Sequence, residues 1–260
     1  MKKLILSLCF LLSSLGAADS WYNKFHLGLE AGVFMNNFGG DIENATPSLT
    51  RFSDDLNYKN TDSSFFALHL KNDIDYVPDL DISYMNVQQN RNAELNDQKF
   101  VAAGDYNGSV RSKISYNVLN TVVKSSFKYK GSMKKFFSWN FYTGDVEYNI
   151  GINAKFISYR FDIEKSDTTD ANFISVESAI ILPYLGAKYY WYDFILHGHV
   201  SALSFSDAKA TSYEAGIDYQ LFKNFYLSAS YMYEDFEATE KLDTVYFKSY
   251  GNKLAMKYYF

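Results

Sequence analysis

Apolar and polar residues alternate with a period of two along most of the chain after Trp21. From Val146 to Phe156, valine, tyrosine, isoleucine, alanine and phenylalanine alternate with glutamate, asparagine, glycine and lysine. A period of two places alternate side chains on opposite faces of a β-strand. The alternating stretches are about 9 to 11 residues long and are separated by turn-rich polar segments, which is typical of strands that cross a membrane in a barrel.

About ten such stretches can be counted, and an even number lets a single-chain barrel begin and end on the same side of the membrane. The predicted fold class is all-β: an antiparallel up-and-down transmembrane β-barrel of about ten strands, with twelve or eight as alternatives. The segment from Leu119 to Asp145 leaves the count open, because it alternates as two further short stretches around the turn at 131–135. We favour ten strands, with this hairpin extended past the membrane.

The connections also alternate in length. The long ones are expected near 36–62, 90–107, 164–173, 206–209 and 237–244, and the tight ones at 76–79, 191–192 and 223–224. Outer-membrane barrels have long external loops and short periplasmic turns. Pro183 lacks a backbone N–H and predicts a bulge in its strand.

The amino terminus predicts a secretory signal peptide over residues 1–18. Lys2 and Lys3 precede an apolar run, and small residues end at Ala18, so cleavage is expected before Asp19. The mature domain is then 19–260. Cys9 is the single cysteine and leaves with the peptide, so disulfides play no part in the expected fold.

The amino-acid composition excludes other classes of protein. After the amino terminus no run of about 18 apolar residues occurs, which excludes a bundle of membrane-spanning helices. Aromatic residues make up 18% of the chain, with 23 Tyr and 22 Phe, so it does not resemble a disordered chain. Loss of Lys2 and Lys3 leaves 23 basic against 30 acidic residues, a net charge of -7, and nucleic-acid binding gains no electrostatic support.

A soluble β-sandwich would alternate in the same way, with its apolar faces meeting in a core. The abundant tyrosines suit membrane-interface girdles, and the opposite faces carry ionisable residues, so the barrel is favoured.

Several short motifs resemble those of a function-unassigned family of small Gram-negative outer-membrane β-barrel proteins. They are Leu-Gly-Leu-Glu-Ala-Gly at 27–32, Gly-Gly-Asp-Ile at 39–42, Tyr-Val-Pro at 76–78, Leu-Pro-Tyr-Leu at 182–185 and the terminal strand that ends in Phe260. The likeness covers most of the mature chain, and 121–145 looks like an insertion. This resemblance implies a β-barrel fold and an outer-membrane location, but it implies no chemical activity, because the family has no assigned function.

The carboxyl terminus resembles the signal that the outer-membrane assembly machinery reads. Its residues are Leu254, Met256, Tyr258 and Phe260. The expected partners are this machinery, periplasmic chaperones and outer-membrane lipids; we expect a monomer and no nucleic-acid partner.

The polar faces of the strands predict a charged lumen. Its expected lining residues are His26, Glu30, His69, Lys71, Asp73, Asp81, Arg111, Lys113, Glu147, Lys155, His197, His199, Glu214, Asp218, Glu234, Lys253 and Lys257. In this interpretation Val110, Ile114, Tyr116 and Val118 face the lipid. Small barrels are filled by side chains, so we expect opposite charges to pair and to leave a narrow or plugged interior, with the histidines adding a response to pH.

Candidate chemistry is weak. The four histidines lack the spacing of a metal motif, and His199 with Ser201 would suggest a lipid hydrolase only if the serine faced the bilayer. We therefore expect no cofactor, no metal and no enzymatic activity. The predicted role is envelope-structural or surface-contact; a small-solute channel is the alternative, and a lipid-modifying enzyme is a third, weaker hypothesis.

Overall fold

The computed structural model describes residues 25–44, 49–58, 60–72, 74, 77–101, 104–136, 139–166, 171–204, 208–240 and 243–260. The expected signal peptide lies outside these ranges. The strands are β1 (Phe25–Asn44), β2 (Leu49–Arg51), β3 (Thr61–Asn72), β4 (Asp79–Val101), β5 (Gly104–Tyr129), β6 (Met133–Phe136), β7 (Trp139–Tyr142), β8 (Asp145–Lys165), β9 (Ala171–Trp191), β10 (Phe194–Ser204), β11 (Ala208–Phe222), β12 (Phe225–Glu240) and β13 (Asp243–Tyr259).

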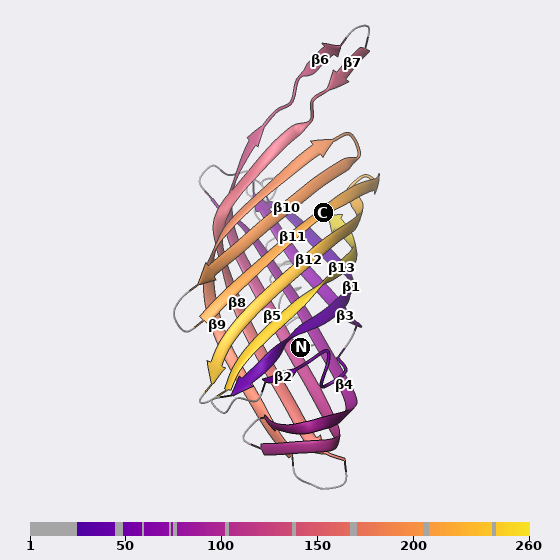
Figure 1. The fold of residues 1–260 in the computed structure, drawn as a ribbon. Helices are drawn as coiled ribbons and strands as arrows, with labels where there is room; N and C mark the ends of the chain where they lie inside the picture. Colours follow the sequence, from indigo (N-terminus) through magenta and orange to yellow (C-terminus); the bar gives the residue numbers. More distant parts are fainter. Residues whose placement is uncertain are drawn as a thin grey trace.

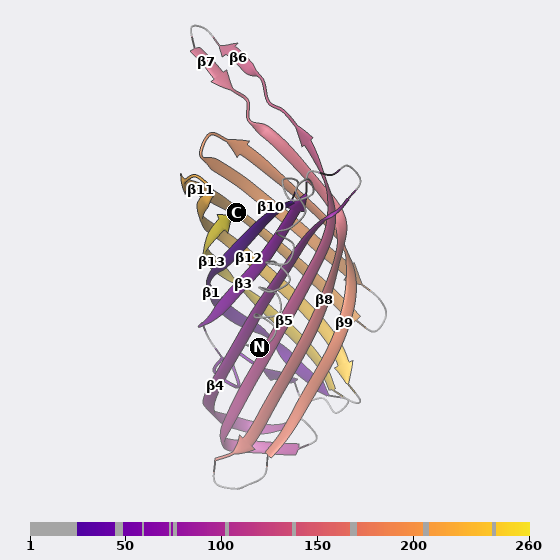
Figure 2. The same ribbon diagram turned by 180° about the vertical axis from the view of Figure 1, so that it is seen from behind.

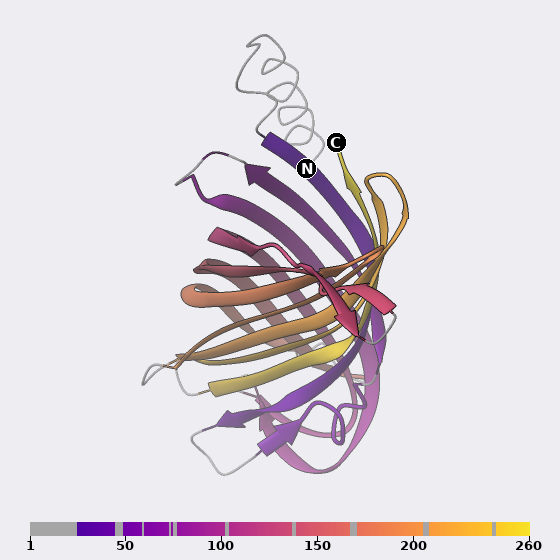
Figure 3. The same cartoon turned by 90° about the horizontal axis from the view of Figure 1, so that it is seen from above.

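Ten of the described strands form a closed antiparallel barrel (Figure 1). Neighbours in sequence pair with each other around the wall, and β13 pairs with β1 to close it, so the first and last strands lie side by side (Figure 3). β2 adds a short pairing to β1, whereas β6 and β7 form a separate two-stranded sheet. The predicted fold class is confirmed, and 133–142 is a hairpin beyond the barrel rather than two further barrel strands. Among the described residues no helix is long and apolar enough to span a membrane.

Both ends of the barrel sequence lie at one rim, which also carries the short β9–β10 and β11–β12 turns and the β6–β7 hairpin. By the usual topology of bacterial barrels this rim is periplasmic. The opposite, external end is built mainly from β4, β5, β8 and β9, which lie side by side in Figure 2. These strands are about twice as long as the roughly 9 to 11 residues that cross a membrane, so the barrel continues well past the bilayer.

Strand β8 shows what changes along this length. From Tyr148 to Phe156 its outward side chains are aromatic or aliphatic, while Glu147, Asn149 and Lys155 point inward. Beyond Phe156 the outward face becomes polar and the inward face becomes apolar. Phe156 is 49% exposed on the outside and Ile157 is 3% exposed on the inside, and Arg160 then faces outward.

Strands β4 and β5 make the same exchange at the same level. Backbone pairing aligns Tyr84, Leu119, Phe156 and Ala179 in one row across β4, β5, β8 and β9, which we call the boundary row. One position further out, Met85, Val118 and Ile157 are buried inside. On the periplasmic side of this row the wall meets lipid and encloses polar groups; on the external side it meets water and encloses an apolar core.

The exchange overturns part of the predicted lumen. Val110, Ile114, Tyr116 and Val118 are fully buried in the interior, not lipid-facing. Arg111 and Lys113 lie on the outer surface of β5, where Arg111 pairs with Glu164 of β8 at 3.0 Å. The predicted period of two holds here, but the opposite face points inward, because this part of β5 stands in water rather than in lipid.

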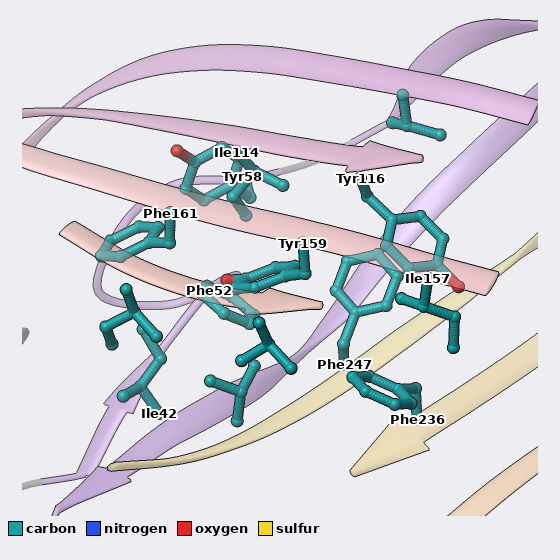
Figure 4. Packing of buried hydrophobic residues seen from close by; sticks show 14 of the residues in the cluster. Ile42, Phe52, Tyr58, Ile114, Tyr116, Ile157, Tyr159, Phe161, Phe236 and Phe247 are labelled. Carbon is teal, nitrogen blue, oxygen red and sulfur yellow. The ribbon is translucent and has the colours of Figure 1, made fainter. Parts of the chain in front are cut away.

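The apolar core fills the external half of the barrel (Figure 4). Tyr116 packs on Phe247 of β13 with ring centroids 4.2 Å apart, and Phe161 of β8 lies 5.9 Å from Phe52. Phe52, Leu56 and Tyr58 are fully buried although they belong to the β1–β3 connection. This connection therefore folds into the barrel as a plug instead of extending as an external loop.

Two further expectations are corrected. The segment 90–107, predicted as a long loop, is mostly paired strand in β4 and β5, with a register shift between Leu95 and Lys99. Pro183 lies in an unbroken β8–β9 ladder, opposite Ile152, so no bulge forms there. The β9–β10 ladder ends at Tyr184, and the missing N–H of Pro183 falls just past it.

Candidate functional site

The periplasmic half of the lumen holds a network of buried charges, which we call the lumen network. Lys253 of β13 lies at its centre. Its Nζ is 2.6 Å from Glu214 Oε1 of β11 and 3.2 Å from Glu30 Oε1 of β1, and it lies over the ring of Phe65 at 4.3 Å. All three charged side chains are at least nine-tenths buried.

The next inward residue of β13 repeats this arrangement. Lys257 Nζ donates to both carboxylate oxygens of Asp218 at 3.0 Å and lies 3.8 Å from Glu30 Oε2. His197 of β10 approaches Asp218 at 3.2 Å. Two lysines of β13 thus link carboxylates of β1 and β11 on the inner face of the wall.

His69 bridges two carboxylates on the other side of Glu30. Its Nδ1 is 2.9 Å from Asp81 Oδ1 and its Nε2 is 3.1 Å from Glu30 Oε2. Both ring nitrogens can donate only in the protonated imidazolium. Lys124 also pairs with Asp81, so the bridge joins β1, β3, β4 and β5.

Lys155 and Glu234 mark the external limit of the lumen network. Lys155 Nζ is 2.7 Å from Glu234 Oε1, and the Tyr116 hydroxyl donates to Oε2 of the same carboxylate at 3.0 Å. The Tyr116 ring belongs to the apolar core. The charge network and the apolar core are therefore continuous from the periplasmic half of the barrel into the external half.

A cavity of about 130 Å³ remains among the network side chains. His199 borders it, with its ring stacked on Tyr184 at 5.3 Å, and Ser201 is buried on the same strand face. Neither faces the bilayer, as a lipid hydrolase would require. Within the described ranges no three or more His, Cys, Asp or Glu side chains are grouped as metal ligands would be.

The structure brings most of the predicted lining residues together. Inside the barrel it places Glu30, His69, Lys71, Asp81, Glu147, Lys155, His197, His199, Glu214, Asp218, Glu234, Lys253 and Lys257. His26 lies exposed at the periplasmic mouth, Arg111 and Lys113 lie outside the wall, and Asp73 is not among the described residues.

Sequence reasoning missed Lys124, Lys188 and Tyr190. Lys124 falls in 119–145, where the alternation changes phase at the boundary row, and Lys188 and Tyr190 follow the blurred apolar run at 180–182. The apolar residues Val123, Phe127 and Tyr129 share one face of this stretch, so alternation places Lys124 on the opposite face.

The terminal residues lie where barrel closure needs them. Leu254, Met256 and Tyr258 point outward and are exposed, and the backbone N–H of Phe260 donates to the Leu27 carbonyl of β1 at 2.8 Å. The Phe260 ring contacts Tyr258 edge-on at 4.9 Å. The last strand is thus tied to the first up to the final residue.

Several solved structures have similar folds. The outer-membrane protease OmpT from Escherichia coli matches with a TM-score of 0.54 at 10% identity, over 90% of this chain and 97% of that chain. The translocator domain of autotransporter NalP from Neisseria meningitidis gives 0.47 at 11% identity, over 99% and 95%. The attachment invasion locus protein Ail of Yersinia pestis gives 0.36 at 9%, over 91% and 99%.

No protein-family model and no curated protein sequence matches the chain. The family resemblance drawn from short motifs therefore stays a prediction. At 10% identity the likeness to OmpT extends to the fold and not to proteolysis. The chain has the fold of a Gram-negative outer-membrane β-barrel.

Proposed function

We propose that this protein resides in the outer membrane as a closed, non-conducting barrel with an envelope-structural or surface-contact role. The observation that carries the proposal is the filled interior. Buried ion pairs occupy the periplasmic half, and the aromatic core with its inserted plug occupies the external half.

Opening such a barrel would be costly. Breaking one partner of a buried ion pair typically costs about 3–5 kcal/mol, because the other charge stays buried without compensation. A path for solute would have to separate Lys253 from Glu214 or Lys155 from Glu234, and also displace Phe52. Both barriers lie in series along the lumen.

The external extension suits a surface role. Beyond the boundary row the wall is polar outside and packed inside, with exposed ion pairs such as Arg111–Glu164 and Arg160–Asp162. A packed column gives the external ends of β4, β5, β8 and β9 a rigid outer wall, which a surface partner can contact. Assembly of the barrel would use the terminal strand and periplasmic chaperones.

Conductance in planar lipid bilayers tests the closed state. The refolded mature chain should show no steady conductance, in contrast to a general porin measured under the same conditions. The variant Lys253→Ala should show brief openings or a loosened barrel, because Glu30 and Glu214 lose their shared cation. Large, steady wild-type conductance would instead make the protein a small-solute channel.

A further inference from the structure

The periplasmic mouth holds an excess of cations around one buried carboxylate. Glu147 of β8 is fully buried. Lys71 of β3 lies 3.8 Å from its Oε2, Lys128 of β5 lies 4.0 Å from Oε2, and Lys188 of β9 lies 4.0 Å from Oε1. Three ammonium groups from three strands thus surround a single carboxylate.

These contacts leave hydrogen-bonding capacity unused. At 3.8–4.0 Å none of the three lysines hydrogen-bonds to Glu147, whose short contact is the Tyr190 hydroxyl at 2.8 Å. Glu147 Oε1 is buried and has no hydrogen-bond partner among the described residues. Each ammonium carries three donors, so the cluster offers more donors and more positive charge than Glu147 can satisfy.

The second carboxylate at this mouth does not remove the excess. Asp79 accepts hydrogen bonds from the Asn72 backbone at 3.0 Å and from the Ser126 hydroxyl at 2.7 Å. With Asp79 counted, three lysines still face two carboxylates.

A cavity of about 850 Å³ opens beside these groups. Its polar wall consists of His26, Lys71, Asn72, Asp79, Ser125, Ser126 and Lys128, and Ile74, Val77 and Phe127 contribute apolar surface. Ligand pockets commonly enclose roughly 300–1,000 Å³. Phe127 is 51% exposed at the membrane edge, so the cavity lies where periplasm, barrel mouth and lipid headgroups meet.

We propose that this mouth binds a phosphate group, carried either by a soluble phosphate ester or by a phospholipid headgroup of the inner leaflet. A phosphate has several acceptor oxygens, so it can take charge-assisted hydrogen bonds from both Lys71 and Lys128, which line the cavity, while Lys188 adds positive charge on the far side of Glu147. The apolar wall would contact the glycerol or acyl portion of an ester. This site lies at the periplasmic end of the lumen, next to the lumen network, whose cavity Lys188 also lines. Phosphate binding at this mouth does not depend on whether the barrel conducts.

Calorimetric titration of the refolded mature chain with inorganic phosphate tests the site. Wild type should bind, and the variant Lys71→Gln/Lys128→Gln should bind about tenfold more weakly or worse, because two charge-assisted contacts are lost. The matched control is Lys223→Gln, an exposed lysine in the β11–β12 turn at the same rim, which should bind like wild type. Heat-modifiable migration in gel electrophoresis checks that each variant is folded. If the double variant does not fold, the single variant Lys128→Gln, at the more exposed of the two lysines, replaces it.

A second experiment, with lipid vesicles, distinguishes a phospholipid headgroup from a soluble phosphate ester. The protein is extracted from vesicles of phosphatidylglycerol mixed with diacylglycerol, and the retained lipid is identified by native mass spectrometry. Retention of phosphatidylglycerol that the lysine variants lose points to a headgroup, whereas phosphate binding without lipid retention points to a soluble ester. The proposal is overturned if wild type binds neither probe, or if the lysine variants bind both as wild type does.

Discussion

Glu234 lies at the junction of two interiors, a charged one and an apolar one. One carboxylate oxygen pairs with Lys155 from the far wall at 2.7 Å, and the other accepts the Tyr116 hydroxyl at 3.0 Å. The Tyr116 ring in turn packs on Phe247. A single side chain therefore compensates a buried cation and satisfies a buried hydroxyl whose ring is part of the core.

The substitution Glu234→Ala should lower the free energy of unfolding by about 3–5 kcal/mol, because Lys155 stays buried without its partner. Urea unfolding in lipid vesicles measures this change. Arg111→Ala is the control: its pair with Glu164 is exposed, with 64% and 41% of the side chains accessible, so the cost should stay below about 1 kcal/mol. Equal costs for the two variants would show that Lys155 is solvated and that the lumen network is open to water.

At the scale of elements, the connection between β1 and β3 is the unexpected part. β2 pairs briefly with β1, the Phe52 backbone N–H donates to the Gly40 carbonyl at 3.1 Å, and the Tyr58 hydroxyl donates to Ser112 at 3.0 Å. Phe52 and Tyr58 meet edge-on at 6.1 Å. Pairing with β1, backbone turn hydrogen bonds within 51–58 and packing on the barrel interior together hold this segment in place.

Phe52→Ala should release the plug and cost about 3–5 kcal/mol of stability, as expected for emptying a buried aromatic site. Limited trypsin digestion reports the release directly, since Arg51 lies in the plug and should become a cleavage site in the folded variant. Met133→Ala, at an exposed side chain of the β6–β7 hairpin, serves as the control and should leave the digestion pattern unchanged. Wild-type resistance in Phe52→Ala would mean that the plug is held mainly by its other contacts.

For the whole molecule, closure depends on the pairing of β1 with β13. The ladder runs from Gly28 opposite Tyr259 to Asn44 opposite Asp243, and Phe260 adds one more backbone hydrogen bond at the periplasmic rim. The final residue contributes little to this ladder but is exposed and aromatic. Its role in assembly can therefore be separated from its role in stability.

Deletion of Phe260 should reduce the amount of heat-modifiable protein in the outer membrane, because the terminal strand presents the residues expected to be recognised by the assembly machinery. After refolding in vitro, the same variant should differ from wild type by only about 1 kcal/mol, the typical value of one hydrogen bond. Membrane fractionation and urea unfolding supply the two measurements. Normal insertion of the shortened chain would contradict the assembly signal, and a large loss of stability would assign Phe260 to barrel closure.

The sequence by itself determined the fold class, because alternation with a period of two identifies strands and the faces their residues share. An even count of stretches, with tight turns at one rim, predicts ten strands. Where the wall meets lipid, alternation also predicts most residues of the lumen network, with Lys124 and Lys188 as exceptions. Glu147, Asn153 and Lys155 on β8 are such positions, since polar groups opposite a lipid-facing row must point inward.

Only the tertiary structure decided where along each strand the polar face stops pointing into the lumen. Alternation says which residues lie together on a face, but not what medium the face meets, so Val118 and Ile157 could be assigned inward only once their rows were aligned beyond the membrane. For the same reason, alternation alone predicts Arg111 and Lys113 inside the barrel, whereas they lie on its outer surface. Pairings such as Lys155 with Glu234 join strands that are far apart in sequence and opposite across the lumen, and only barrel closure and tilt bring these charges together.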